Sequence, residues 1–468
     1  MESEVGLEVL ALLPEIVLIA GALVVLLSGS FLPRSRQGVA YAIATATALL
    51  SATAVPMTFA TGSEAVFAGN FLVDSTTQVA RIAVSGATLL VLLAGRGSIA
   101  GSPRESETAA LILLGAAGTL VVAGAGDLLV LAVGFLLASV PLYGLIGLGG
   151  TARAAEAALK TYLLGALFGV TLLLGVTLLT GLSGTSVYSE LPTALAEAPA
   201  GAVTVGAAAA LSGLMFKAGA VPGHFWVPDS AQGTNGLAAI FLTTVPKLGA
   251  FLAAFRIVGA LPDPAPAAFF VGLLALVTMT LGNLAAYTQD DPRRLLGWST
   301  VGQAGFLLVP AAVAPTSALA LPALLFYVLA YAVTNAAAFS VTLALPGFRR
   351  LADYRGLARQ HPALAAALVV GLLGLVGTPP TAIFVGKLTI AAAAWQGGAA
   401  WLAVAVMANS VISLYYYLRW IIPLYRPADA ERIEPTATPR VGAARTAVAA
   451  AVLSVLLGVA AGVVFSVL

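Results

Sequence analysis

The chain lacks cysteine and has only two histidines, His224 and His361, among its 468 residues. Without cysteine it cannot form a disulfide, hold an iron–sulfur cluster or use a thiol as a nucleophile. Two imidazole groups are too few for a haem pair or a dedicated zinc site, and no Gly-rich phosphate loop or dinucleotide fingerprint occurs. We therefore expect no metal site and no redox or nucleotide cofactor bound by this chain.

Charge is also scarce, because 9% of the residues are charged whereas 60% are hydrophobic. Too little polar surface remains to cover a water-soluble core, so the composition predicts an integral membrane protein in the lipid bilayer, with no nucleic-acid partner. A hydrocarbon core about 30 Å thick needs roughly 20 apolar residues per helix. Nearly the whole chain divides into such segments, so we expect an all-α polytopic fold of about fourteen spans in a single membrane domain, 1–468. The predicted spans are 9–29, 37–59, 75–95, 107–125, 127–148, 155–183, 201–221, 236–260, 266–287, 295–314, 317–345, 363–391, 398–424 and 444–467.

Basic residues predict the orientation of these spans. The opening “MESEVGLEVL” has acids where a secretory signal has basic residues, so we expect the first span to be retained rather than cleaved. Sixteen of the eighteen arginines lie in or beside every second connection, beginning with Arg34 and Arg36, and the alternate connections carry acids such as Glu190. By the positive-inside rule, both termini should lie outside a bacterial inner (plasma) membrane.

All four lysines, in contrast, lie inside predicted spans: Lys160, Lys217, Lys247 and Lys387. Desolvation can lower the pKa of a buried lysine from about 10.4 toward 5–6, whereas arginine stays protonated in proteins. Only lysine can therefore pass a proton on, and the row of lysines favours a proton relay over structural anchors. Snorkelling of a single lysine toward a helix end is the alternative, and it applies most to Lys160, close to the end of its span.

Prolines interrupt two of the spans next to lysines. Pro222 follows Lys217, and Pro379 with Pro380 precedes Lys387. Proline removes a backbone donor and breaks a helix, and in lipid such breaks persist only where they face protein or a wet cavity. The three prolines therefore predict helix breaks beside two of the lysines.

The two interrupted segments resemble each other. “GAVPGHFWV” and “GTPPTAIFV” share the first glycine, the fourth-place proline, an aromatic residue at the eighth place and the final valine. Interrupted helices at matching positions are typical of inverted-repeat transporters, with the working site near mid-membrane. Because the breaks fall five spans apart, we predict two inverted five-helix repeats. These are residues 107–260 and 266–424, with three helices before them in 1–95 and one after them in 444–467.

At these residues the sequence resembles the antiporter-like membrane subunits of respiratory complex I, the proton-pumping NADH:quinone oxidoreductase, and specifically subunit N. The resemblance covers about residues 8 to 426 in order. It is carried by the motifs “LPEI”, “FKAGAVPGHFWVPD”, “VPKLGAFLAAFR”, “RRLLGWSTVGQAGF” and “ANSVISLYYYLR”.

The resemblance implies a fourteen-helix subunit whose lysines belong to a hydrated axis along the membrane arm, next to M-like and K/J-like membrane subunits. Flavin, iron–sulfur clusters and quinone are implied in partner subunits rather than here. Lys217 and Lys387 match the family's broken-helix residues, Lys247 matches the connecting lysine, and Lys160, in “LKTY”, matches the lysine of an “LKYF”-like motif.

Three departures from the family pattern affect this proton route, and one of them is “AQGTNG”, residues 231–236, in place of the family's “YEGAP”. The fifth span of the family carries a glutamate in a pattern like “GLELLSLPLY”, whereas this chain reads “GFLLASVPLY” and Leu136 takes that place. The family's usual histidine in “SSIAHAGY” is Gln303 here. Without the carboxylate, the charged form of Lys217 loses a stabilising partner. We therefore expect impaired conduction, and a non-conducting structural copy stays an alternative.

Three further residues are possible accessories. Glu15 is most simply a helix-end or interhelical contact, and proton transfer is its other reading. His224 could cap a helix, meet a lipid headgroup or carry a proton. Asp229 is expected to cap the next helical piece. A cation/proton antiporter subunit of the multisubunit type, which shares the same repeat, remains an alternative function.

Overall fold

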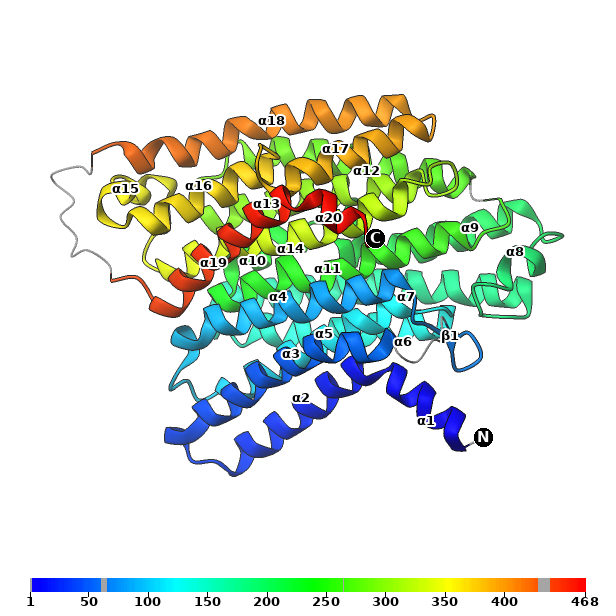
Figure 1. Cartoon of the computed structure of the whole chain (residues 1–468), viewed down its shortest axis with the longest axis horizontal. Coiled ribbons are helices and arrows are strands. Elements are labelled where there is room, and N and C mark those ends of the chain that lie inside the picture. Colours follow the sequence, from blue (N-terminus) through cyan, green and yellow to red (C-terminus); the bar gives the residue numbers. More distant parts are fainter. Residues whose placement is uncertain (1, 60–64, 264, 428–437) are drawn as a thin grey trace.

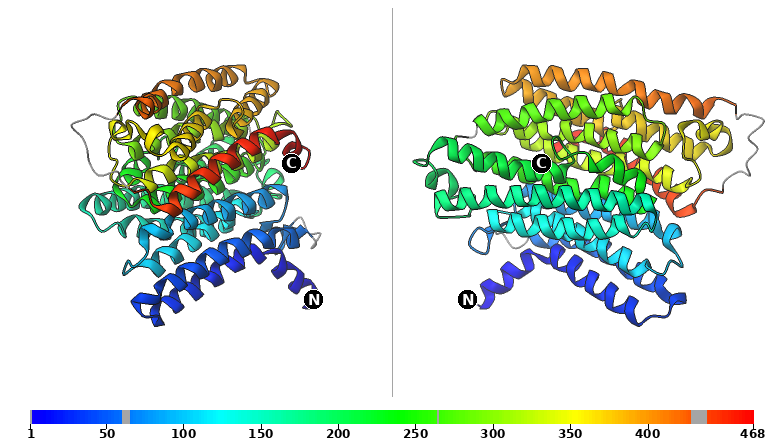
Figure 2. Two further views of the ribbon diagram at one scale, coloured as in Figure 1. Left: turned by 60° about the vertical axis from the view of Figure 1, so that its left-hand side comes forward. Right: turned by 180° about the vertical axis from the view of Figure 1, so that it is seen from behind.

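The computed structural model describes residues 2–59, 65–263, 265–427 and 438–468, and nearly all of them are helical. Most of the long helices run side by side along roughly one common direction (Figures 1 and 2). Within this part of the chain, thirteen helices are long and apolar enough to cross a membrane. They are α2 (Leu13–Phe31), α3 (Gln37–Phe59), α4 (Ser75–Ile99), α5 (Glu105–Gly124), α6 (Leu128–Gly147), α7 (Ala152–Ser183), α9 (Ala200–Ala218), α11 (Gly236–Gly259), α12 (Ala265–Ala286), α13 (Pro292–Ala312), α14 (Ala320–Ala344), α18 (Ala400–Tyr425) and α19 (Val441–Val459).

The remaining elements are short. Two apolar helices, α16 (Pro362–Val376) and α17 (Ala382–Gln396), occupy the twelfth predicted span. The others are α1 (Glu2–Ala11), α8 (Leu191–Ala194), α10 (Trp226–Gly233), α15 (Leu357–Gln360), α20 (Ala461–Phe465), the 3₁₀ helices η1 (Arg34–Arg36) and η2 (Leu351–Tyr354), and an antiparallel pair of two-residue strands, β1 (Ala65–Val66) and β2 (Phe71–Leu72). The all-helical polytopic fold is therefore confirmed.

Two boundaries differ from the sequence prediction. The first predicted span, 9–29, is divided at Leu12 into α1 and α2, because Pro14 fits the first turn of a new helix better than a helix interior. The seventh, 201–221, ends earlier, at Ala218 of α9, and the next helical piece, α10, begins at Trp226 rather than at the expected cap Asp229. The apolar residues Trp226 and Val227 of α10 are fully buried, and this burial stabilises the helical piece.

Small residues allow the helices to pack closely. A methyl group added at Gly118 of α5 would lie 2.3 Å from the backbone nitrogen of Ala138 in α6. One added at Gly282 of α12 would lie 2.3 Å from the backbone nitrogen of Gly302 in α13. Lipid tails are as apolar as leucine, so close van der Waals packing rather than burial from water holds such helices together. The central helices α11, α13 and α14 consequently have few lipid-accessible residues.

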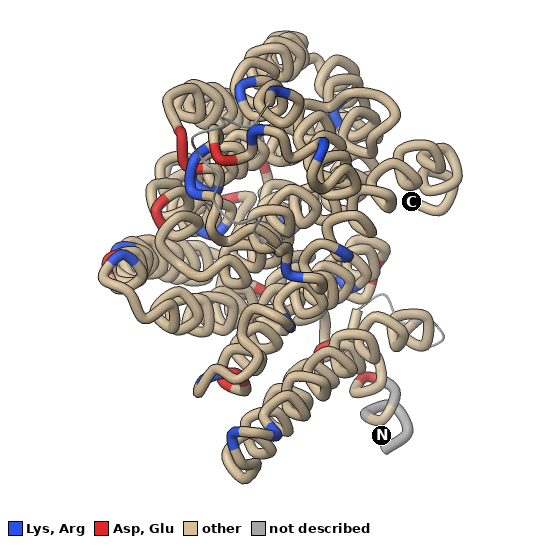
Figure 3. Tube along the Cα trace, turned by 90° about the vertical axis from the view of Figure 1, so that its left-hand side faces the viewer, with Lys and Arg blue, Asp and Glu red and all other residues tan. Residues whose placement is uncertain are grey.

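Most arginine-bearing connections lie at one end of the helix bundle, which we call the arginine face. It includes the α6–α7 connection with Arg153, the start of α13 with Arg293, and the segment after α14 with Arg349. Figure 3 views this end, where Lys and Arg are distributed across the ends of many helices.

Candidate functional site: two helix breaks with buried lysines

The first helix break separates α9 from α10. α9 ends at Ala218, and Gly219 follows it with a left-handed φ of 70°, a conformation that glycine adopts without steric cost. Pro222, joined to Val221 by a cis peptide bond, has no backbone N–H to continue the helix. The predicted break at Pro222 is thus present.

The second helix break separates α16 from α17. Gly377 follows α16 with a φ of 88°, and α17 begins at Ala382. Pro379 and Pro380, joined by a cis peptide bond, lie between the two helices, as the sequence predicts. Each break leaves helix-end carbonyl groups that need a donor, because the next turn of helix is missing.

Lysines supply these donors. In the first break, Lys247 of α11 donates from Nζ to the carbonyl oxygen of Ala218 at 2.9 Å, and its amine lies 5.2 Å from the centre of the Trp226 ring. In the second break, Lys387 of α17 donates to the carbonyl oxygens of Val376 at 2.8 Å and Leu375 at 3.2 Å. Both lysines are almost completely buried, and helix-end carbonyl groups accept hydrogen bonds from both amines.

Lys217 turns away from the break toward α6. Its Nζ donates to Ser139 Oγ, and it lies 5.0 Å from the centre of the Phe135 ring. Leu136, which the sequence analysis matched to the family's glutamate, lies on the same helix but is 48% exposed. The polar partner of Lys217 on α6 is therefore a hydroxyl group, and Leu136 forms part of the outer surface of the chain.

Gln303 of α13 connects the second break to α14. Its amide nitrogen donates to the Leu375 carbonyl oxygen at 2.8 Å, the same oxygen that Lys387 approaches, and its amide oxygen accepts from the Tyr327 hydroxyl at 2.7 Å. Lys387 also lies 4.0 Å from the centre of the Phe306 ring, one turn along α13. A neutral amide thus fixes the carbonyl group that faces the lysine.

A polar ladder on α14 continues from this point toward α11. We call Tyr327, Tyr331 and Asn335 the α14 ladder; they are spaced four residues apart and so lie on one helix face. The Tyr331 hydroxyl donates to the Thr243 carbonyl oxygen, and Asn335 Nδ2 donates to Thr243 Oγ1 at 3.1 Å and Thr244 Oγ1 at 2.9 Å. Thr243 precedes Lys247 by one turn of α11. The sequence analysis missed the ladder, although the four-residue spacing of its members was a signal.

Lys160 is not buried with the other three lysines. It lies on α7 with 47% of its side chain exposed and forms ion pairs with Glu156 at 2.7 Å and Asp229 at 3.0 Å. Asp229 also binds Arg294 at 2.6 Å. The helix α10 begins at Trp226, so Asp229 lies in its first turn and does not cap it; the expected capping role is wrong. Through these ion pairs, Asp229 of α10 instead connects its helix to α7 and α13.

The two other accessory candidates, Glu15 and His224, are buried and contact neighbouring side chains. Glu15 receives two hydrogen bonds from the Arg81 guanidinium, at 2.8 and 2.9 Å, and both side chains are almost fully buried. This pair joins α2 to α4, as the interhelical reading of Glu15 predicts. His224 lies inside the first break, 4.0 Å from the Phe225 ring centre and 5.8 Å from that of Trp298.

This combination of broken helices and buried lysines defines the class of antiporter-like membrane subunits, and comparisons with known proteins agree. A model of the family described as NADH:quinone oxidoreductase/Mrp antiporter, TM, matches residues 125–413. The chain is 54% identical over 467 residues to NADH-quinone oxidoreductase subunit N of Mycobacterium sp. (strain JLS), covering 99% of both chains. It is 46% identical to NADH-quinone oxidoreductase subunit N 1 of Streptomyces griseus subsp. griseus, covering 100% of this chain and 99% of the relative.

Solved structures give the same result. A chain of respiratory complex I from Thermus thermophilus with bound aureothin matches with a TM-score of 0.83 and 30% identity, over 97% of this chain and 98% of that one. A chain of the Mrp complex from Dietzia sp. DQ12-45-1b shares the fold with a TM-score of 0.83 at 23% identity, over 99% and 96% of the two chains. The chain therefore belongs to the NADH-quinone oxidoreductase subunit N family of antiporter-like membrane proteins, as its motifs indicate.

Proposed function

We propose that this chain is a membrane-arm subunit of an NADH:quinone oxidoreductase and moves protons through its buried lysines while quinone is reduced in other subunits. The names of the relatives support membership of such a complex. The polar contacts that lie between the two helix breaks support a proton path through the lysines. The chain has no redox role of its own in this proposal. Flavin, iron–sulfur clusters and quinone belong to partner subunits, and M-like and K/J-like membrane subunits are its neighbours.

The observation that carries the proposal is the α14 ladder between two buried amines. Starting at Lys247, polar groups of Thr243 and Tyr331 lead along α14 to Tyr327, Gln303 and then Lys387. The buried Asn335 Oδ1 accepts no hydrogen bond from any described residue, so it can accept one from a transient water. Water between such groups would complete a path for protons, with the lysines as the groups that change charge. We also propose that the two breaks belong to two inverted five-helix repeats, 107–260 and 266–424.

Lys247→Met tests the relay. We expect the proton-to-electron ratio of vesicles containing the whole complex to fall, because a thioether cannot bind a proton. Lys247→Arg is the decisive companion, since arginine keeps the charge and a donor but does not release its proton. If the lysine only anchors the Ala218 carbonyl group, Lys247→Arg would retain pumping, and the proposal would be wrong. Leu248→Met, a buried neighbour of similar volume, is the matched control and should pump normally.

A non-conducting structural role is the second candidate, and Leu136 favours it. Lys217 has Ser139 rather than a carboxylate as its α6 partner. Comparing the native chain with Leu136→Glu in the same complex separates the two readings. A ratio that is low in the native chain and rises in the variant favours the structural copy, whereas full pumping by the native chain favours the relay.

We further propose that the arginine face points to the cytoplasm of a bacterial plasma membrane. The absence of cysteine allows a direct test, because each introduced cysteine is then the single thiol of the chain. Ser35→Cys lies at the arginine face and Ala196→Cys in the α8–α9 connection at the opposite end, and both positions are exposed. A membrane-impermeant maleimide added to intact cells should label only Ala196→Cys. Labelling of Ser35→Cys alone would reverse the orientation.

A further inference from the structure

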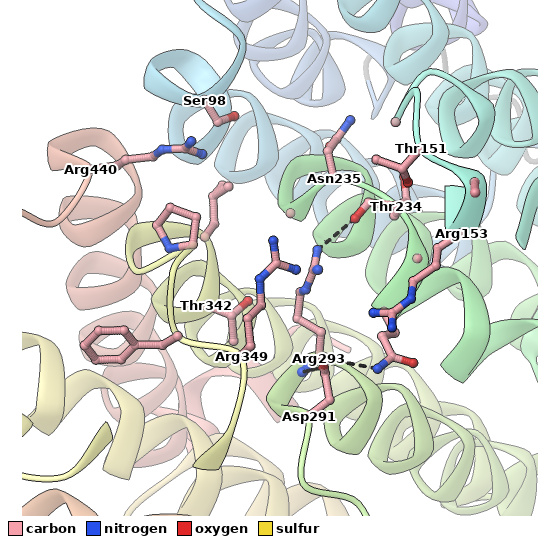
Figure 4. Close-up of a pocket in the computed structure, with 18 residues that line it drawn as sticks. Ser98, Thr151, Arg153, Thr234, Asn235, Asp291, Arg293, Thr342, Arg349 and Arg440 are labelled. Carbon is pink, nitrogen blue, oxygen red and sulfur yellow. Dashed lines mark hydrogen bonds between the residues drawn. The ribbon is translucent and has the colours of Figure 1, made fainter. Parts of the chain in front are cut away.

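A cavity of about 670 Å³ opens at the arginine face, away from the lysine route (Figure 4). It lies between the ends of α4, α7, α10, α11, α13, α14 and α19. Its charged lining residues are Arg153, Arg293, Arg349, Arg440 and Asp291. Four guanidinium groups therefore share one cavity with a single carboxylate.

The carboxylate is occupied by contacts with the protein. Asp291 accepts hydrogen bonds from the backbone N–H groups of Arg293 and Arg294 at the start of α13 and from Gln232 Nε2 at 3.1 Å. Arg293 donates from Nη1 to the Thr234 carbonyl oxygen at 2.8 Å. Asp291 thus stabilises a helix start and leaves most of the positive charge of the cavity uncompensated.

The other three arginines have donors to spare. Among the residues that the structure describes, no hydrogen bond or ion pair involves the guanidinium group of Arg153, Arg349 or Arg440. Figure 4 shows these side chains around the cavity, with Arg349 close to Arg293. Like charges in one cavity repel one another unless an anion lies between them.

Four helices also begin at this cavity. The residue before the first turn lines it in each case: Thr151 of α7, Asn235 of α11, Asp291 of α13 and Arg440 of α19. Helix N-termini carry partial positive charge, which favours anions. The helix dipoles therefore add to the field of the arginines.

We propose that this arginine cavity binds a phosphate group, carried by an anionic lipid headgroup or free as inorganic phosphate. Guanidinium groups bind phosphate oxygens in a bidentate manner, and several of them around one site match its charge. The cavity is much larger than a halide ion, and Leu343, Pro346 and Phe348 give it an apolar side that suits the glycerol and upper acyl part of a lipid. Its place at the helix ends is the level of lipid headgroups, where basic pockets between helices bind anionic lipids.

Binding to the purified full-length chain in phosphatidylcholine nanodiscs tests the proposal. Native mass spectrometry would measure retention of added dioleoylphosphatidylglycerol, and ³¹P NMR line broadening would measure binding of inorganic phosphate. For the triple variant Arg153→Gln, Arg349→Gln and Arg440→Gln, we expect the affinity for the bound probe to fall by about tenfold or more, because three charge-assisted contacts are lost. Replacing the same three residues by lysine should preserve a measurable part of the affinity, since the charge remains.

A matched control removes three charges from the same face outside the cavity, through Arg34→Gln, Arg36→Gln and Arg104→Gln. Its affinity should stay within about twofold of the native value if the effect is local rather than general. Binding of phosphatidylglycerol identifies a lipid as the source of the phosphate group, and binding of inorganic phosphate alone identifies a soluble source. If neither probe binds, or if the control loses as much affinity as the cavity variant, the proposal is wrong.

Discussion

The two helix breaks satisfy the same chemical need in different ways. In the first break, the donor to the helix-end carbonyl comes from a neighbouring helix, as Lys247 of α11 binds Ala218, and the break's own lysine, Lys217, faces Ser139 of α6. In the second break, Lys387 binds the end of α16 from the other half of the same broken helix, with Gln303 on the same carbonyl. In both breaks, therefore, a lysine amine donates to carbonyl groups at the end of the interrupted helix. The helix that provides this lysine differs between the two breaks.

The largest effect should follow from removing the amine of either break. If the breaks act in series, Lys247→Met, Lys387→Met and the double variant should all lower proton translocation to a similar extent, by about tenfold or more, because each removes a group that exchanges protons. The ratio of protons moved to electrons transferred in reconstituted vesicles is the measurement. Single variants that each retain about half of the pumping, with loss only in the double variant, would show two independent routes instead.

Gln303→Leu tests whether the hydrogen bonds of Gln303 stabilise the second break. The substitution leaves the Tyr327 hydroxyl without its acceptor and removes one donor from the Leu375 carbonyl group. We expect the free energy of unfolding to fall by about 1–3 kcal/mol, the cost of leaving a buried polar group unpaired. Thermal unfolding in detergent measures this change, and Gln303→His, which keeps a donor and an acceptor in one side chain, should recover part of it. Equal stability of all three chains would mean that Gln303 does not support the break.

A pair of glycine variants compares the two breaks directly. A methyl group added at Gly219 would lie 2.1 Å from Lys247 Nζ, whereas one at Gly377 would lie 2.9 Å from Lys387 Cδ, away from its amine. Both substitutions share the strain of a left-handed φ, about 1 kcal/mol, which should lower the two unfolding temperatures similarly. Only Gly219→Ala should displace a lysine amine from its carbonyl partner, so proton translocation should fall more in this variant. Equal pumping by both variants would contradict that contact.

The two helix breaks and the burial of three lysines could be predicted from the sequence, because charged and helix-breaking residues are conspicuous in an apolar chain. The hydrogen-bond partners of the buried charged residues could not be predicted. Ser139 lies 78 residues from Lys217, and Arg81 lies 66 residues from Glu15. Such pairs depend on which helices become neighbours, and close contacts between small residues decide that in lipid. For the same reason the start of α10 was expected at Asp229 rather than at Trp226, since only packing against other helices buries Trp226.

The smallest effect should come from Ser139→Ala, which removes the hydroxyl partner of Lys217 and leaves the Phe135 ring beside the amine. Only one neutral hydrogen-bond acceptor is lost, so we expect the free energy of unfolding to change by about 1 kcal/mol and pumping to stay close to the native value. Ser139→Asp introduces a carboxylate at the same place and should increase pumping if the missing counter-ion limits conduction, since an opposite charge favours the ammonium form. If Ser139→Ala instead abolished pumping as completely as Lys387→Met, proton transfer at the first break would depend on the Ser139 hydroxyl. The two breaks would then no longer differ in how strongly pumping depends on these two groups.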